Sequence, residues 1–366
     1  MTDSQTNNFI IGNQPVVNLH CSLLGSAHPQ FLQATILPGI GMNLLQIKAF
    51  IPNYGEIDLL HSPALGKAKE ILEDSNDLFH NAAFMFGSAL LLPFANRIRG
   101  ELSSDGRLLK TTIAGQKICL PANWQGQQKN AEKHAIHGLV YAEKFTIKER
   151  CNSQLSGELH TNFHGHWPGQ AKIRIDMDMS NTSLIITVTT TNTDEHQLLP
   201  VGIGLHPYFS FPSQSRQQVT LYLPARKRVA INNYQDIFPT GELQEVKNSD
   251  FDFSMKGGRR LDDLYLDDCF TDLSRDARGL ATAAIIDDKA NYGLKIHLQS
   301  SAIKAIQVYA PTKENFIAIE PQFNLADPYN PIWGETDTGM VLLAPGQTTT
   351  WQIGLELFDP SQRNEE

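Results

Sequence analysis

The sequence predicts an all-β protein built from antiparallel strands, because alternation of apolar and polar residues is its dominant pattern. The alternation is clearest in KIRIDMDM (172–179) and LIITV (184–188), which flank the turn residues of SNTS. Two alternating segments joined by a short turn are typical of a hairpin. Helical periodicity is scarce, and we expect only one helical turn, in KAKEILEDSND (67–77).

Further short β segments follow along the chain, separated by clusters of Gly, Pro, Asn and Asp. They are RKRVAI, GLKIHLQS, AIQVYAP, FIAIEP and TTTWQIGLELF. Many short strands with frequent turn signals are typical of a sandwich or a barrel.

The 366 residues contain no repeat, no low-complexity tract and no convincing linker. We therefore expect a single domain over residues 1–366, with a core of about 30–358 and short flexible termini. The tail DPSQRNEE is expected to fray.

Composition excludes several classes of function. Hydrophobic residues make up 41% and charged residues 19%, which is ordinary for a soluble globular protein. A net charge of −9 with no basic run argues against a nucleic-acid partner. The start does not resemble a signal peptide, and the longest apolar stretch contains a proline, so no membrane association is expected. The four cysteines form no CxxC pair, which favours a reducing cytoplasm over a disulfide framework or a zinc site.

Two residues are candidates for proton transfer. His206 lies in GIGLHPYFSF, where Pro207 restricts its backbone to extended conformations and Tyr208 and Phe209 are expected to pack around it. Glu320 ends the apolar segment FIAIE, and a carboxylate at the end of a buried strand has a raised pKa unless it is paired. Each has a structural alternative, namely a core histidine with both nitrogens hydrogen-bonded and a buried ion pair of Glu320 with Arg97.

Other polar residues lie beside glycine, proline or apolar runs. Arg97 follows Asn96 after an apolar segment, and it could grip hydroxyls or simply pair with a carboxylate. His137 precedes Gly138, where the backbone can bend and let a ligand approach. In LDDCF, Asp267 and Asp268 must face opposite sides of a strand, and alternation does not decide which one enters a cleft.

A metal site was weighed for the remaining histidines. His160, His164 and His166 lie close in sequence and could in principle ligate zinc together with His134 and His137. Their spacing matches no zinc signature, so these histidines predict no metal site.

Six motifs taken together resemble the aldose 1-epimerase (galactose mutarotase) family. They are NRIRG, IHG, LHPYF, LDDCF, QVYAP and IEPQ, in this order between about Leu37 and Leu357. The resemblance implies a galactose mutarotase-like super-sandwich with a sugar cleft and with no metal or organic cofactor. It also implies a small-molecule aldohexose substrate, such as glucose or galactose, and a monomer or weak homodimer.

The resemblance also implies residue roles. His206 matches the family's general acid and Glu320 its general base. The residues matching its sugar-binding positions are Asn96, Arg97, His137, Asp267 and Gln307. Asp267 is selected over Asp268 by the D-x-x-F pattern.

The expected reaction is interconversion of the α and β anomers of a free hexose through ring opening and closure. It needs one base for the C1 hydroxyl and one acid for the ring oxygen. To stay protonated, His206 would need a nearby carboxylate, and Asp267 is the candidate. Alternatives are a hexose-6-phosphate 1-epimerase using Arg226–Arg228 or Arg259 and Arg260 for the phosphate, a non-catalytic sugar-binding protein, and a glycosidase using Asp267 and Glu320.

Overall fold

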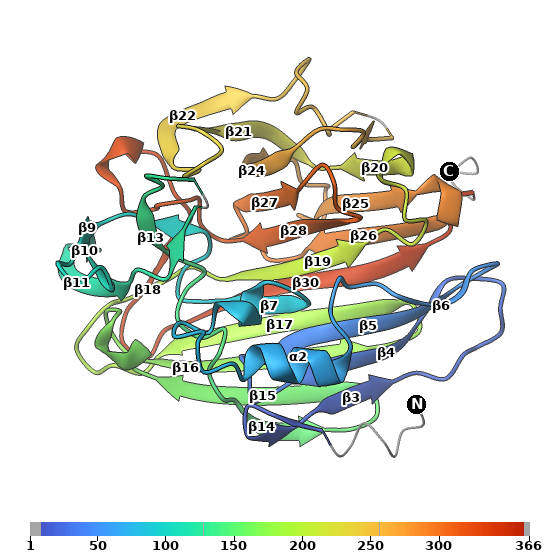
Figure 1. The fold of residues 1–366 in the computed structure, drawn as a ribbon, viewed down its shortest axis with the longest axis horizontal. Coiled ribbons are helices and arrows are strands. Elements are labelled where there is room, and N and C mark those ends of the chain that lie inside the picture. The colour runs from blue at the N-terminus through green and yellow to red at the C-terminus, as the bar shows by residue number, and fades with distance from the viewer. Residues whose placement is uncertain (1–8, 127, 256, 362–366) are drawn as a thin grey trace.

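The protein is a β-sandwich dominated by two large antiparallel sheets (Figure 1). The computed structural model describes residues 9–361 except 127 and 256. The expected flexible termini fall mainly on residues 1–8 and 362–366, which lie outside the described residues. All pairs of named strands in the described ranges are antiparallel, so the predicted fold class is confirmed.

The larger sheet has nine strands and includes the predicted hairpin, with Met179 opposite Leu184. In spatial order its strands are β14 (Thr146–Arg150), β15 (Gln154–Thr161), β16 (Ala171–Met179), β17 (Ser183–Asn192), β30 (Thr348–Phe358), β26 (Tyr292–Leu298), β25 (Ala281–Asp287), β20 (Val219–Tyr222) and β23 (Arg259–Arg260).

The second sheet has seven strands and carries most of the candidate site residues. Its order is β22 (Pro239–Glu245), β21 (Ala225–Ile231), β24 (Leu266–Leu273), β27 (Ala305–Ala310), β28 (Phe316–Gln322), β19 (Gly204–Ser210) and β7 (Ser88–Leu91).

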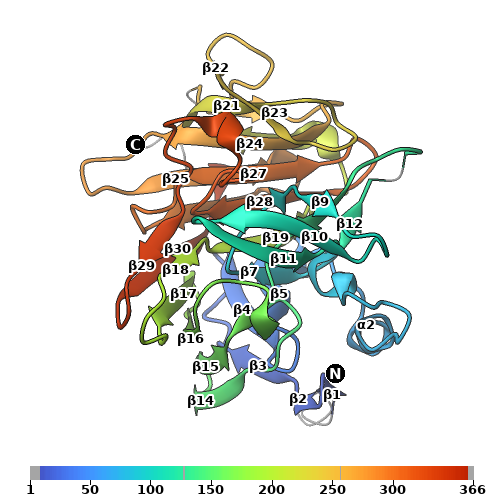
Figure 2. The same cartoon turned by 90° about the vertical axis from the view of Figure 1, so that its left-hand side faces the viewer.

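Smaller sheets extend this framework. A four-stranded sheet consists of β3 (Val17–His20), β4 (Gln30–Leu37), β5 (Asn43–Ile51) and β6 (Gly55–Asp58). The others are β11–β10–β9 (Gln116–Pro121, Leu108–Ile113, Glu101–Leu102), β12–β13–β8 (Trp124–Gln125, Lys133–Ile136, Arg97–Ile98), β18–β29 (Leu199–Val201, Val341–Leu343) and β1–β2 (Ile10–Ile11, Gln14–Pro15). In Figure 2 the β10–β11 hairpin lies toward the viewer at one end of the molecule.

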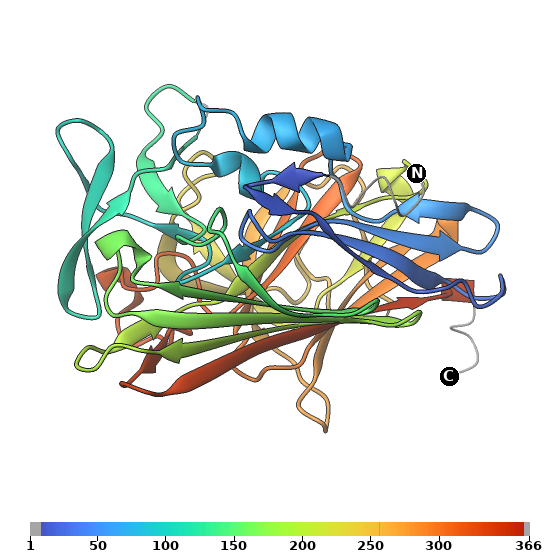
Figure 3. The same cartoon turned by 90° about the horizontal axis from the view of Figure 1, so that it is seen from below.

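The predicted helix forms, but with other bounds. Helix α2 spans Leu65–Leu72. It therefore begins before the start of the expected segment 67–77 and ends well before the end of that segment. Only Ala68 and Leu72 of this helix are buried, so it is a surface helix that packs on the β-sheets through a narrow face. Figure 3 shows α2 on the opposite side of the molecule from the layer formed by β15, β16, β17 and β30. The remaining short 3-10 turns are Asn81–Phe84, Phe163–Gly165, Arg216–Gln218, Asp288–Ala290 and Pro331–Trp333.

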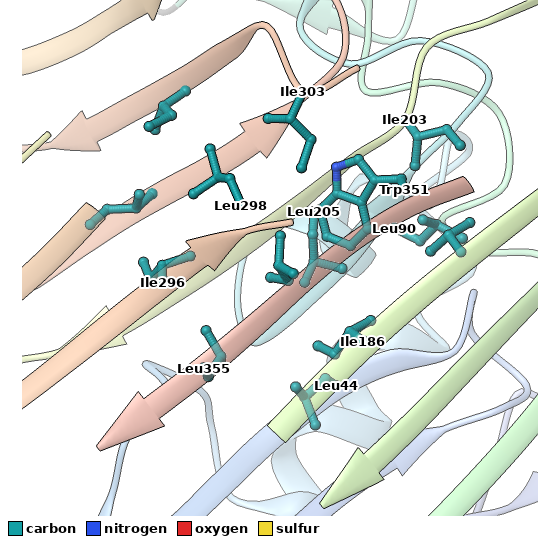
Figure 4. Packing of buried hydrophobic residues seen from close by; sticks show 14 of the residues in the cluster. Leu44, Leu90, Ile186, Ile203, Leu205, Ile296, Leu298, Ile303, Trp351 and Leu355 are labelled. Carbon is teal, nitrogen blue, oxygen red and sulfur yellow. The ribbon is translucent and has the colours of Figure 1, made fainter. Parts of the chain in front are cut away.

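Apolar side chains from the large sheets and from β5 fill the core. Trp351 on β30 is fully buried, and Leu205 on β19, Leu90 on β7 and Ile186 on β17 lie around it (Figure 4). Burying one such aliphatic side chain contributes about 1.5–3 kcal/mol. Because strand side chains alternate, the neighbours of Leu205 along β19 project from the other face of the seven-stranded sheet.

Candidate active site

A pocket opens on the face of the seven-stranded sheet that is turned away from this core. Its volume is about 370 Å³. Six of the seven residues singled out in the sequence line it, namely Arg97, His137, His206, Asp267, Gln307 and Glu320. Residues from distant parts of the chain therefore meet at one cavity.

Strand register brings three of these side chains into one row. Gln307 on β27 pairs with Glu320 on β28. Between β28 and β19, Gly204 pairs with Gln322 and Tyr208 with Ala318, so His206 lies level with Glu320. Side chains at the same level of adjacent strands share a face and lie within contact distance.

Glu320 does not end its strand, contrary to the sequence prediction. Strand β28 continues through Pro321 to Gln322, and Pro321 pairs with Ile306. Proline lacks only the N–H donor, so its extended φ can still fit a strand where that donor is not needed. Pro207 occupies β19 in the same way, and His206 has the predicted extended backbone.

His206 stacks on Tyr208, with ring centroids 4.5 Å apart and an interplanar angle of 19°. Phe209 does not pack around it, contrary to expectation, because successive strand residues face opposite sides. Phe209 belongs to the main core instead.

Arg97 and His137 reach the pocket from a separate, small sheet. Strand β8 begins at Arg97, which pairs with Ile136 at the end of β13. The His137 N–H donates to the Asn96 carbonyl at 2.9 Å, and both residues are left-handed, with φ of 63° and 62°. Such backbone conformations are unfavourable for non-glycine residues and persist where the surroundings enforce them.

Gly138 also has a positive φ, 79°. The space that a side chain would occupy at this position is filled by the protein backbone and not by a ligand cavity. A Cβ atom there would lie 2.3 Å from the Leu92 carbonyl oxygen. The close approach predicted for this glycine is therefore made by the backbone of Leu92.

A closed ring of hydrogen bonds orients the polar floor of the pocket. Asn96 Nδ2 donates to Gln307 Oε1 at 2.8 Å, and Gln307 Nε2 donates to Asp267 Oδ1 at 2.6 Å. Arg97 completes the ring, with Nη2 3.3 Å from Asp267 Oδ2 and Nη1 3.1 Å from Asn96 Oδ1. Asn96 itself does not line the pocket, so it acts through Gln307 and Arg97.

His206 and Glu320 form a buried pair, with Nε2 and Oε1 3.2 Å apart. Only 5% of His206 and 1% of Glu320 is exposed. Burial lowers the pKa of His206 and raises that of Glu320 well above its usual range. Both shifts favour the neutral forms, with the proton of the pair on Glu320 and not on His206. His206 Nδ1 and Glu320 Oε2 are buried without a hydrogen-bond partner among the described residues.

The carboxylate beside His206 is therefore Glu320, and the expectation that Asp267 holds the His206 proton is wrong. Asp267 is engaged by Arg97 and Gln307. The structural alternative for Glu320, an ion pair with Arg97, does not form either, because Arg97 pairs with Asp267. Burial raises the pKa of Asp267, and the positive charge of Arg97 opposes that rise.

Asp268 does not line the pocket, in agreement with the choice of Asp267. It is fully buried, 2.9 Å from Arg228 Nη1, and it accepts hydrogen bonds of 3.0 and 3.2 Å from the Tyr234 hydroxyl. Burial raises its pKa to about 6.

Tyr265, Tyr309 and Tyr234 also line the pocket and were missed in the sequence. Tyr265 and Tyr309 lie two positions from Asp267 and Gln307, respectively, as Tyr208 does from His206. Residues two apart on a strand share a face, so period-two spacing from the polar residues could have found them.

Three side chains of the pocket have the ligand atoms and the spacing that a divalent cation would need. His137, His206 and Glu320 each offer one ligand atom, and these atoms lie within 4.8 Å of one another. Of the histidines considered for zinc in the sequence, His137 belongs to this set, whereas His164 contacts Glu143 and His166 contacts the Cys119 carbonyl. The four cysteines are unpaired.

The basic clusters considered for a phosphate also lie away from the pocket lining. Arg226 pairs with Asp272, Arg228 with Asp268 and Arg259 with Asp250. Among the described lining residues Arg97 is the one Lys or Arg, and it is paired with Asp267.

The molecule is thus a β-sandwich whose pocket holds a buried histidine–carboxylate pair among hydrogen-bonding side chains. The sequence profile described as "Aldose 1-epimerase" matches residues 46–356, and the chain belongs to this family. A search of curated protein sequences gave no significant match.

Solved structures share the fold at low sequence identity. A galactose mutarotase-like protein from Clostridium acetobutylicum has a TM-score of 0.69 and 18% identity, covering 94% of this chain and 99% of that one. An aldose epimerase homologue from C. elegans has a TM-score of 0.70 and 19% identity, with 94% and 98% covered. Galactose 1-epimerase from Lactobacillus acidophilus has a TM-score of 0.60 and 14% identity, with 94% and 98% covered. No helix among the described residues is long and apolar enough to cross a membrane.

Proposed function

We propose that the protein interconverts the α and β anomers of a free hexose, with Glu320 as base and His206 as acid. The observation that carries this proposal is the buried pair of these residues, 3.2 Å apart, in a pocket lined by hydrogen-bonding groups. An acid and a base at adjoining positions are what ring opening requires.

The proton transfers balance without a covalent enzyme intermediate. Glu320 takes the proton of the C1 hydroxyl, whose electron pair forms the aldehyde C=O bond. The C1–O5 bond breaks, its electrons remain on O5, and His206 donates a proton there. The C1–C2 bond then rotates, and closure on the other face of the aldehyde reverses both transfers and restores each residue.

The proton of the pair must move from Glu320 to His206 before the reaction. The two arrangements hold the same number of protons, and the 3.2 Å between Nε2 and Oε1 is a hydrogen-bond distance. The positive charge of Arg97 lowers the pKa of both groups, so it favours ionised Glu320 but opposes protonated His206. Sugar hydroxyls that donate to the carboxylate favour the transfer, because hydrogen bonds to the charged form stabilise it.

The other floor residues then hold the sugar. Arg97, Asp267, Gln307 and His137 supply donors and acceptors for its hydroxyls, and Asn96 keeps Gln307 and Arg97 oriented. Burial and the neighbouring His206 lower the pKa of His137 well below its ordinary value, so it serves as a neutral hydrogen-bonding group.

Charge favours a free sugar over a sugar phosphate. The His206–Glu320 pair with its one proton is neutral overall, so the charged groups of the described lining are Asp236 and Asp267 against one arginine. A phosphate dianion placed there would meet net negative charge.

Polarimetry of freshly dissolved α-D-glucose, α-D-galactose and glucose 6-phosphate tests the proposal. We expect a faster approach to equilibrium for the free hexoses and its loss in His206→Asn. Acceleration of glucose 6-phosphate alone would establish the sugar-phosphate epimerase. Tight sugar binding without acceleration would establish a binding protein, and release of sugar from a glycoside would establish a glycosidase.

A further inference from the structure

We infer that the floor of the pocket is also a binding site for a divalent transition-metal ion such as Zn²⁺. His137, His206 and Glu320 are its ligands, and the bound ion excludes the sugar. This inference goes beyond the proposed function, because the ion occupies the acid and the base without serving the reaction. Only the loss of activity on metal binding rests on the proposed function, and the site itself does not.

The three ligand atoms converge on one point of the floor. His206 Nε2 lies 3.2 Å from Glu320 Oε1, and the three ligand atoms all lie within 4.8 Å of one another. A tetrahedral Zn²⁺ with bonds of about 2.1 Å needs ligand atoms about 3.4 Å apart. The first pair already has nearly this separation. The distances to His137 need to shorten by at most about 1.4 Å, which a small rotation about its broad χ2 well can supply.

Packing holds the ligands in place before an ion arrives. His206 and Glu320 lie level on the adjacent strands β19 and β28, and His137 directly follows β13. The His206 ring stacks on Tyr208 at 4.5 Å, and the His137 ring meets the Phe84 ring edge-on at 5.0 Å between centroids. Ligands fixed in this way lose little conformational entropy when they bind an ion.

Unused hydrogen-bonding capacity at the floor independently indicates a ligand. His137 Nδ1, His206 Nδ1 and Glu320 Oε2 are buried without a hydrogen-bond partner among the described residues. Buried polar atoms without a partner are destabilising, so a group that engages these side chains is favoured. Each of the three side chains therefore has lone pairs that the surrounding protein does not use.

The charge of the lining matches that of a divalent cation. Glu320 gives up its proton to solvent when the ion binds, because a metal-bound carboxyl group is ionised. The charged groups of the described lining are then Asp236, Asp267 and Glu320 against Arg97, which leaves two negative charges. The charge of Arg97 is itself compensated by Asp267, 3.3 Å away. The ion would therefore meet no net repulsion.

The ligand types select a transition metal over Mg²⁺ or Ca²⁺. Two imidazole nitrogens and one carboxylate oxygen are typical of Zn²⁺, whereas Mg²⁺ and Ca²⁺ prefer oxygen ligands. The ligands line a pocket of about 370 Å³, so a fourth coordination position is left for water. Because the ion takes the lone pairs of His206 and Glu320, neither residue can transfer a proton while it is bound.

Titration with Co²⁺ alone tests the site. Zn²⁺ has a filled d shell and gives no visible spectrum, so Co²⁺ is the optical probe. We expect a single Co²⁺ ion per chain, and a loss of affinity of at least about 100-fold in His137→Asn, His206→Asn and Glu320→Gln. His164→Asn is the matched control, because His164 forms an exposed pair with Glu143 at 2.7 Å. Cys151→Ser is a second control, because this thiol is exposed. Mg²⁺ should not displace Co²⁺.

Inhibition by Zn²⁺ separates this inference from the proposed function. Zn²⁺ should raise KM for mutarotation of α-D-galactose without changing kcat, and a chelator should restore the activity. If no sugar is turned over but Co²⁺ binds and His206→Asn abolishes the binding, the proposed function is wrong and the metal site stands. Turnover of sugar by a protein that binds no Co²⁺ would overturn the metal site. Unchanged Co²⁺ affinity in folded His206→Asn and Glu320→Gln proteins, or an equal loss in either control, would overturn it as well.

Discussion

Replacing Glu320 by Gln tests the proposed chemistry with little change in shape. The side chain is 1% exposed and its raised pKa favours the neutral acid, so the substitution replaces it by a neutral amide of similar volume. We therefore expect the free energy of unfolding to change by less than about 1 kcal/mol. The amide cannot accept the C1 hydroxyl proton, and loss of a general base costs about 10²–10⁴-fold in rate.

The assay is polarimetry of α-D-galactose and α-D-glucose, with the spontaneous rate subtracted and folding checked by thermal melting. Glu314→Gln is the control, because Glu314 is exposed on the turn between β27 and β28. Retention of more than about a tenth of wild-type kcat/KM in a folded Glu320→Gln protein would refute the role of Glu320 as base.

Three further outcomes are expected. The pKa of His206 is lowered and that of Glu320 is raised, so the pair keeps its single proton over a wide pH range. We therefore expect kcat/KM at about pH 5 to stay within about twofold of its value at pH 7. A decline of kcat/KM centred near the ordinary histidine pKa would contradict this. Arg97→Lys keeps the charge but cannot reach both Asn96 and Asp267, so KM should rise at least about tenfold, and an unchanged KM would exclude Arg97 from binding. Leu205→Ala leaves a cavity beside Trp351 and should lower the free energy of unfolding by about 2–5 kcal/mol in urea titration, whereas a loss below about 1 kcal/mol would contradict the packing described.

Local patterns in the sequence were sufficient for the β class and for the 171–192 hairpin, since period-two alternation depends on neighbouring residues only. These local patterns did not decide between a sandwich and a barrel, because strands have the same pleat in both. The two architectures differ in which distant strands pair. The prolines in β19 and β28 show a similar limit. Whether a strand tolerates Pro207 or Pro321 depends on the hydrogen bonds that its partners require, which the strand's own residues do not reveal.

Site residues were found through the family resemblance, and their contacts were not predicted. Alternation placed Asp267 and Asp268 on opposite sides of a strand. It did not show which side faces the pocket, because that depends on the register with β27. The proximity of Glu320 to His206 depends on the register of β28 with β19. Tyr234 lies on a connection between strands, where no periodicity exists to indicate it.

The row of Gln307, Glu320 and His206 across β27, β28 and β19 also has a consequence for folding kinetics. Chain segments separated by about a hundred residues or more must pair before His206 meets Glu320 and before Arg97 meets Asp267. Such long-range contacts form late, because their loop-closure entropy is lost before the contacts are gained. No fragment with native local structure can contain the assembled site. Recovery of catalysis during refolding should therefore report completion of the whole sheet and lag behind the appearance of β-structure.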